Sequence, residues 1–180
     1  MANLLTGLRL LLIVPVSWGL AMPGSINAWL LLLLIVLAIV SDILDGKLAR
    51  ASGTSTARGM LFDHSTDFLF VTCGLAALAY REIVPVLLPL LIVIAFSQYV
   101  LDSYWLFRQK QLRMSFIGRW NGILYFVPLV VMAVAAVEIV PRAYSLLLAA
   151  TTWFAYLLIL SSLASIVDRG IAPQRKHTPK

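Results

Sequence analysis

The sequence is poor in charged residues and almost without cysteine. Of its 180 residues, 12% are charged and 61% are hydrophobic, against roughly 25% and 45 to 50% in average soluble domains. With a mean hydropathy of +0.94, the chain is excluded from the ordinary soluble class and is typical of a protein with several membrane spans. Its one cysteine, Cys73, rules out a disulfide framework and a cysteine metal site.

The sequence also predicts neither a cleavable leader nor a nucleic-acid surface. The N-terminus has no basic region followed by a short apolar core and a small-residue cleavage site, so we expect the first apolar segment to be a retained helix. The net charge of +6 comes from residues in short loops and in the tail around the apolar runs. We therefore expect anionic lipid headgroups and phosphorylated substrates as partners, and no nucleic acid.

Long apolar runs predict an all-α integral membrane protein. At about 20 apolar residues for each span, the sequence gives six transmembrane helices, which we place at Leu4–Met22, Ala28–Asp45, Gly59–Tyr80, Ile83–Phe107, Trp120–Val140 and Tyr144–Val167. Residues 1–169 form the predicted membrane domain, and residues 170–180 form a polar tail with two prolines.

Basic residues are distributed unequally between the two sides of these spans. The connectors at 46–58 and 108–119, together with Arg169 and the tail, carry eleven lysines and arginines, whereas the opposite side has only Arg81 and Arg142. Because positive loops stay in the cytoplasm, both termini are predicted to be cytoplasmic. Arg9 lies within the first span.

Four of the eight acidic residues lie in one stretch of 26 residues. Asp42 and Asp45 end the second apolar run, and Asp63 and Asp67 begin the third. An ionised carboxylate at membrane depth costs about 2.5 to 3.5 kcal/mol on insertion scales. Spacings of three and four residues place each pair on one helical face. With the second and third spans side by side, the two faces would meet in one cytoplasm-facing cleft.

This donor set predicts a cation site. Carboxylates without a cysteine or histidine cluster suit Mg²⁺, Mn²⁺ or Ca²⁺ and disfavour zinc, and bridging carboxylates can hold two ions about 3.5 to 4 Å apart. Gly46, Ala49 and Gly59 share these faces and allow close approach of a ligand. Arg50 offers a forked donor for a phosphate. A cation transporter or channel is the competing interpretation, but no acidic ladder crosses the other spans.

The pattern D-x2-D-G-x2-A-R-x8-G-x3-D-x3-D, complete from Asp42 to Asp67, resembles the signature of the CDP-alcohol phosphatidyltransferases. All eight defining positions match. The resemblance implies a homodimer with six spans that transfers a phosphatidyl group from CDP-diacylglycerol to a polar alcohol and releases CMP. We expect it to be located in the inner membrane of a bacterium.

The resemblance also implies a role for each matching residue. Two divalent cations, Mg²⁺ or Mn²⁺, would be held by Asp42, Asp45, Asp63 and Asp67, and Asp67 would also be the general base for the acceptor hydroxyl. The CDP site would be lined by Gly46, Ala49, Arg50 and Gly59.

The acceptor alcohol stays open at this point. The opening NLLTGLRLLLIVPV is similar to phosphatidylglycerophosphate synthases, which favours glycerol 3-phosphate, but His64 and Phe68 depart from their LDPLADK-like run. Inositol phosphate or another alcohol is the alternative. Cations for an acceptor phosphate would come from the loops and the tail: Arg119 first, then Arg113, Arg108, Lys110 and Arg169. Asp102 is expected to pair with a loop arginine, and His64 to point about 100° away from Asp63.

Overall fold

The computed structural model describes residues 2–51, 57–101, 116–137 and 143–171, and these ranges contain helices and turns without a strand. The helices are α1 (Ala2–Ala21), α2 (Ala28–Ala51), α3 (Ala57–Tyr80), α4 (Leu87–Leu101), α5 (Phe116–Leu124), α6 (Phe126–Ala136) and α7 (Ala143–Ile171). The all-α prediction is confirmed, and α7 runs two residues past the predicted domain boundary at 169.

Local chemistry explains where the first helices stop and start. Gly24 adopts a φ of +85°, which suits a residue without a side chain, and so turns the chain after α1. Asn27 then caps α2, since its Oδ1 accepts hydrogen bonds from the backbone N–H groups of Trp29 and Leu30 at 3.0 and 3.3 Å. The predicted turn between the first two spans is thus a short capped connection.

The fifth predicted span is interrupted. Helices α5 and α6 meet at Tyr125, three residues before Pro128. Proline lacks the N–H that would bond the carbonyl four residues earlier, which weakens the helix at this point. The two pieces still form one apolar stretch, Ile117–Ala136, that is long enough to cross a membrane.

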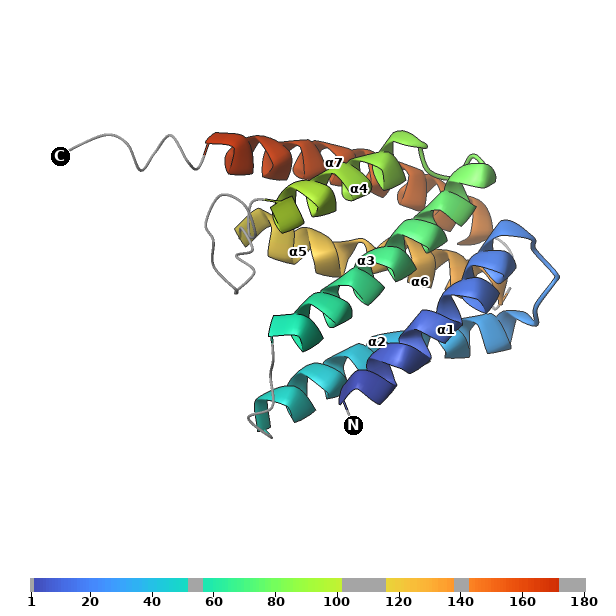
Figure 1. Cartoon of the computed structure of the whole chain (residues 1–180). Helices are drawn as coiled ribbons and strands as arrows, with labels where there is room; N and C mark the ends of the chain where they lie inside the picture. Colours follow the sequence, from blue (N-terminus) through green and yellow to red (C-terminus); the bar gives the residue numbers. More distant parts are fainter. Residues whose placement is uncertain (1, 52–56, 102–115, 138–142, 172–180) are drawn as a thin grey trace.

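The helices form a bundle in which α1 packs against both α2 and α3, α6 packs against α2, α3 and α7, and α4 packs against α3 and α7 (Figure 1). The prediction that the second and third spans lie side by side is wrong: among the described residues, α2 and α3 make few direct contacts, because α1 packs between them. A helix that comes first in the chain therefore takes part in the predicted cleft.

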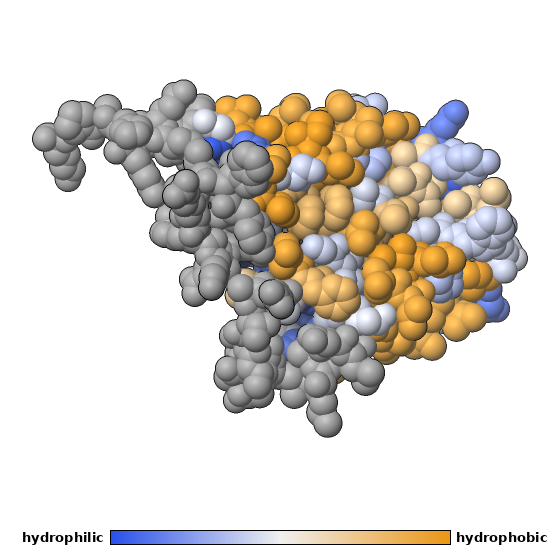
Figure 2. Space-filling model, in the orientation of Figure 1, coloured by the Kyte–Doolittle hydropathy of each residue, from blue (hydrophilic) through white to orange (hydrophobic). Residues whose placement is uncertain are grey.

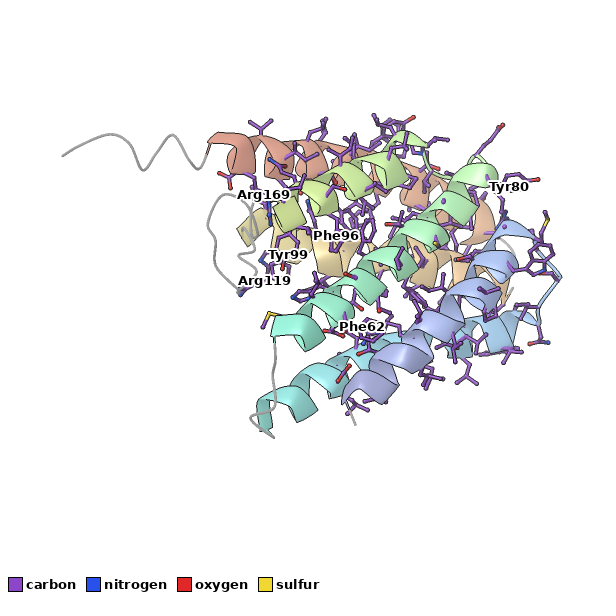
Figure 3. All side chains as sticks on the ribbon, viewed as in Figure 1. Phe62, Tyr80, Phe96, Tyr99, Arg119 and Arg169 are labelled. Atoms are coloured by element: carbon purple, nitrogen blue, oxygen red, sulfur yellow. The ribbon has the colours of Figure 1, made fainter. Side chains whose placement is uncertain are left out.

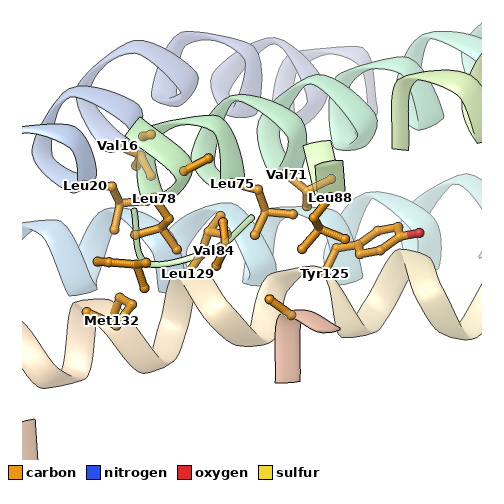
Figure 4. Packing of buried hydrophobic residues seen from close by; sticks show 14 of the residues in the cluster. Val16, Leu20, Val71, Leu75, Leu78, Val84, Leu88, Tyr125, Leu129 and Met132 are labelled. Carbon is orange, nitrogen blue, oxygen red and sulfur yellow. The ribbon is translucent and has the colours of Figure 1, made fainter. Parts of the chain in front are cut away.

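Apolar side chains fill the centre of the bundle and also cover its outside. Val16, Leu75, Leu78, Leu88 and Leu129 belong to the buried core (Figure 4). Many other large apolar side chains are exposed, and a band of them crosses the face in Figure 2, whose end near the α1–α2 and α3–α4 turns is more hydrophilic. Apolar residues on the outside need an apolar surrounding.

Three helical stretches among the described residues are long and apolar enough to cross a membrane, namely Ala28–Lys47, Ile117–Ala136 and Ala143–Gly170. Leu5–Ala21 and Leu87–Leu101 are shorter apolar helices. Helix α3 is long, with 24 residues, but its first half carries Asp63 and Asp67. Together with the exposed apolar surface, these stretches make the chain an integral membrane protein.

Candidate functional site

Arg9 lies at the centre of the acidic residues. Its side chain is fully buried, with Nη2 3.1 Å from Asp42 Oδ1 and Nη1 3.2 Å from Asp63 Oδ1. Nη1 also donates a hydrogen bond to Asp67 Oδ1. One guanidinium from α1 thus joins carboxylates from α2 and α3, and the acidic faces converge around it.

Asp45 lies beside this cluster in a separate contact. Its Oδ2 accepts a hydrogen bond from the hydroxyl of Thr6, one helical turn before Arg9 on α1. Its other oxygen, Oδ1, is buried and has no hydrogen-bond partner among the described residues. Because a buried carboxylate oxygen is costly when left unpaired, this atom is available to a partner from outside the described residues, such as a cation.

The donor set fits a divalent cation. A single guanidinium offsets only one of four carboxylate charges, and buried charges require compensation. Oxygens of Asp63 and Asp67 and a ring nitrogen of His64 lie within 4.8 Å of one another, so these three residues form a group that could hold a metal ion. The unpaired Oδ1 of Asp45 supports the same conclusion.

His64 is closer to the acidic cluster than the helical wheel predicted. Although its backbone position is turned from Asp63 by about 100°, its ring nitrogen reaches the same group. The ring also makes an edge contact with Tyr99 of α4, with centroids 6.3 Å apart. His64 therefore links the acidic cluster to α4.

A cavity of about 710 Å³ adjoins the acidic cluster. Asp42 and Asp67 line one part of it, and Arg119 of α5 and Arg169 of α7 line another. Arg119, Tyr99 and Arg169 lie at the same end of the bundle, away from Tyr80 (Figure 3). The guanidinium of Arg169 lies 4.9 Å from the centre of the Tyr99 ring, a cation–π contact. The other walls are largely apolar.

Two of the five basic residues predicted to bind an acceptor phosphate line the cavity. Arg119 and Arg169 line it, whereas Arg108, Lys110, Arg113 and the predicted partner Asp102 lie outside the described residues. Arg9, whose guanidinium contacts these carboxylates, was noted in the sequence only as lying within the first span. The sequence feature that could have identified Arg9 as a site residue is its position within an apolar span, where a charged side chain is rare and needs a buried partner.

The small residues of the predicted CDP site are only partly described. Gly46 in α2 and Gly59 in α3 are both half-buried near the ends of their helices that carry the aspartates. Ala49 and Arg50 belong to the last turns of α2, and their side chains lie outside the described residues. The role of these four positions stays a prediction.

Comparison with known proteins gives two matches. The family model described as CDP-alcohol phosphatidyltransferase matches residues 1–160. A protein named cardiolipin synthase (CMP-forming), from Streptomyces coelicolor, is 42% identical over 67 residues. That alignment covers 37% of this chain and 31% of the relative, so the chain spans less than a third of the relative's length in it. Since the family model extends over most of the sequence, the chain belongs to the CDP-alcohol phosphatidyltransferase family.

Proposed function

We propose that the protein transfers a phosphatidyl group from CDP-diacylglycerol to the hydroxyl of a polar alcohol and releases CMP. The observation that carries this proposal is the convergence of Asp42, Asp63 and Asp67 on one guanidinium, at the edge of a cavity that Asp42 and Asp67 also line. A cation-binding cluster beside a cavity is the arrangement that phosphoryl transfer requires.

In the proposed reaction the acceptor oxygen attacks the phosphorus that carries the diacylglycerol group. A phosphorus–oxygen bond forms, the bond from that phosphorus to the bridging pyrophosphate oxygen breaks, and CMP leaves with the electron pair. Asp67 accepts the proton of the acceptor hydroxyl. Its position between the cluster and the cavity supports this role. The displacement is single, without a phosphoenzyme.

Two divalent cations, Mg²⁺ or Mn²⁺, would be held by Asp42, Asp45, Asp63 and Asp67. When bound, they offset the pyrophosphate charge and polarise the attacked phosphorus. Gly46, Ala49, Arg50 and Gly59 would surround the CDP group, with Arg50 near its phosphates.

The favoured acceptor is glycerol 3-phosphate, whose phosphate Arg119 and Arg169 would bind at the cavity. A phospholipid with a free hydroxyl is a second candidate. Two observations favour it: the largely apolar walls of the cavity, and the similarity to a protein named cardiolipin synthase. The phosphate of an inositol phosphate would bind the same two arginines.

We propose six membrane spans, in which α5 and α6 together form the fifth. Arg9, Asp42 and Asp63 lie in the halves of α1, α2 and α3 that are remote from the α1–α2 and α3–α4 turns. In the sequence the basic connectors follow the end of α2 and precede the start of α5. The positive-inside rule supports a cytoplasmic location for the cleft and for both termini. The bacterial relative supports an inner-membrane location. A homodimer is the proposed assembly.

The experiment that tests this function is an acceptor panel. Purified protein is incubated with CDP-diacylglycerol, Mg²⁺ or Mn²⁺, and one of glycerol 3-phosphate, inositol 1-phosphate, inositol, serine or phosphatidylglycerol, and CMP and the lipid product are quantified. We expect CMP release that requires both metal and acceptor. Absence of CMP with every acceptor, in the presence of metal, would contradict the proposed function.

A further inference from the structure

A buried tyrosine contacts two functional parts of the cavity, although the reaction described above does not use it. Tyr99 of α4 is 3% exposed and lines the cavity. Its ring makes an edge contact with the ring of His64, which belongs with Asp63 and Asp67 to the group that could hold a metal ion. The guanidinium of Arg169, from α7, lies 4.9 Å from the centre of the same ring. Tyr99 therefore joins the acidic group to a cation of the cavity.

Packing holds the Tyr99 ring in place. Phe68 of α3 and Phe96 of α4 stack on each other, with centroids 4.1 Å apart and 8° between the ring planes. The Phe96 ring in turn lies 5.9 Å from the Tyr99 ring, tilted by 47° (Figure 3). Because the interior of a protein is close-packed, these neighbours restrict the orientation of the Tyr99 ring. The ring is thus a fixed surface for Arg169.

Arg169 belongs to the end of its helix, where order is most easily lost. Helix α7 ends at Ile171, two residues later, and helix ends fray. A long arginine side chain also loses rotamer entropy when it is fixed in one position. The attraction between a guanidinium and an aromatic ring offsets part of this cost before any ligand binds. Because the ring is uncharged, this contact holds the guanidinium without neutralising it.

Resting on the proposed function, we propose that Tyr99 is a positioning residue, which holds the Arg169 guanidinium at the cavity for the phosphate of the acceptor. A cation that is ordered in advance binds its ligand more tightly, since the cost of ordering does not fall on the binding step. The contact of the same ring with His64 fixes where this cation lies relative to the acidic group. The acceptor class that fits is an alcohol that also carries a phosphate, either free or as part of a lipid headgroup.

The test separates the aromatic ring from packing. Tyr99→Phe keeps the ring and loses only the hydroxyl, whereas Tyr99→Leu removes the ring. Arg169→Gln, alone and combined with Tyr99→Leu, completes a double-mutant cycle. Phe70→Leu is the matched control, because it removes a buried ring that stacks on Phe126 in the core. KM and kcat are measured for CDP-diacylglycerol, glycerol 3-phosphate and phosphatidylglycerol, together with the melting temperature. The two acceptors distinguish a free phosphate from a lipid headgroup.

We expect Tyr99→Leu to raise KM for the phosphate-bearing acceptor that the wild type uses by about fivefold, the scale of one cation–π contact. In Tyr99→Phe and Phe70→Leu this KM should stay within about twofold of the wild-type value, and KM for CDP-diacylglycerol should do so in every variant. Once Arg169→Gln is present, Tyr99→Leu should raise the acceptor KM no further. Tyr99→Met takes the place of Tyr99→Leu if the latter does not purify as a folded protein.

Three results would overturn the role of Tyr99 while an active wild type upholds the transferase. They are an acceptor KM that is unchanged in Tyr99→Leu, an equal rise in Tyr99→Phe or Phe70→Leu, and additive effects of Tyr99→Leu and Arg169→Gln. A wild type that releases CMP only with inositol or serine, which carry no phosphate, would also overturn it. A wild type without CMP release for any acceptor, with metal present, would contradict the proposed function itself.

Discussion

At the scale of single residues, Arg9 is the buried positive charge that partly neutralises the aspartates of the site. A completely buried guanidinium contacts three carboxylates from two other helices, at a depth where an unpaired charge of either sign is costly. The arginine lies at the place where added cations are expected, so it acts as a fixed counter-ion. Divalent cations would then bind carboxylates that Arg9 already holds together.

Replacing Arg9 with methionine should destabilise the metal-free protein by about 3 to 5 kcal/mol, since removing one partner leaves buried charges without compensation. Divalent cations should restore part of this loss. The measurement is thermal unfolding in detergent with EDTA and with Mg²⁺, and the variant should gain more stability from Mg²⁺ than the wild type does.

Arg81→Met is the matched control for this prediction. Arg81 donates hydrogen bonds to the carbonyl of Leu20 and to the Tyr144 hydroxyl, which are neutral partners. Its loss should leave the response to Mg²⁺ unchanged. Equal responses of the two variants would show that Arg9 has no special relation to the cation site.

At this scale the sequence predicted the acids but not their partner. The spacing from Asp42 to Asp45 and from Asp63 to Asp67 identifies a shared face for each pair, because helical geometry is local. Arg9 and Asp67 are 58 positions apart in the sequence, and no local sequence pattern predicts a contact over that separation. The same holds for Thr6 and Asp45, which are 39 positions apart.

At the scale of helices, close packing holds α3 against α6. Gly74 on α3 faces Leu129 on α6, and a Cβ added at Gly74 would lie 2.5 Å from Leu129 Cδ2. Leu129 is fully buried in the core, so it has little room to move. The distance between these two helices therefore depends on a residue without a side chain.

Gly74→Val should destabilise the protein by about 1 to 3 kcal/mol, the typical cost of overpacking a core. Leu129→Ala in the same chain should recover part of the loss because it frees the space that valine needs. The melting temperatures of both single variants and the double variant measure this coupling. Gly7→Val serves as the control, since an added Cβ at Gly7 meets no described atom within 4 Å.

The approximate bounds of the helices could be predicted from the sequence, but the pairs of helices that pack together could not. Apolar runs gave the approximate bounds of α1, α2 and α7, and Pro128 explains the break between α5 and α6. Adjacency in the chain suggested that the second and third spans pack together. In the structure α1 packs against both, and its polar residues Thr6 and Arg9 contact the aspartates of α2 and α3.

At the scale of the whole molecule, the orientation in the membrane can be tested with the chain's single cysteine removed. In a Cys73→Ser background, Ser25→Cys lies in the α1–α2 turn and Gly170→Cys near the end of α7, and both positions are exposed. In intact cells a membrane-impermeant maleimide should label Ser25→Cys, and it should label Gly170→Cys only after permeabilisation. The reverse pattern would contradict the proposed cytoplasmic cleft.

The central claim concerns the whole site, in which a metal-binding aspartate cluster transfers a phosphatidyl group and Asp67 removes the proton. The most direct measurement compares CMP release by the wild type and by Asp67→Asn, with CDP-diacylglycerol, Mg²⁺ and the acceptor that the panel identifies. Binding of CDP-diacylglycerol to both proteins is measured in parallel. Turnover should fall by at least about a hundredfold in Asp67→Asn, the low end for loss of a general base, while lipid binding is largely retained. Full activity in Asp67→Asn would contradict the account.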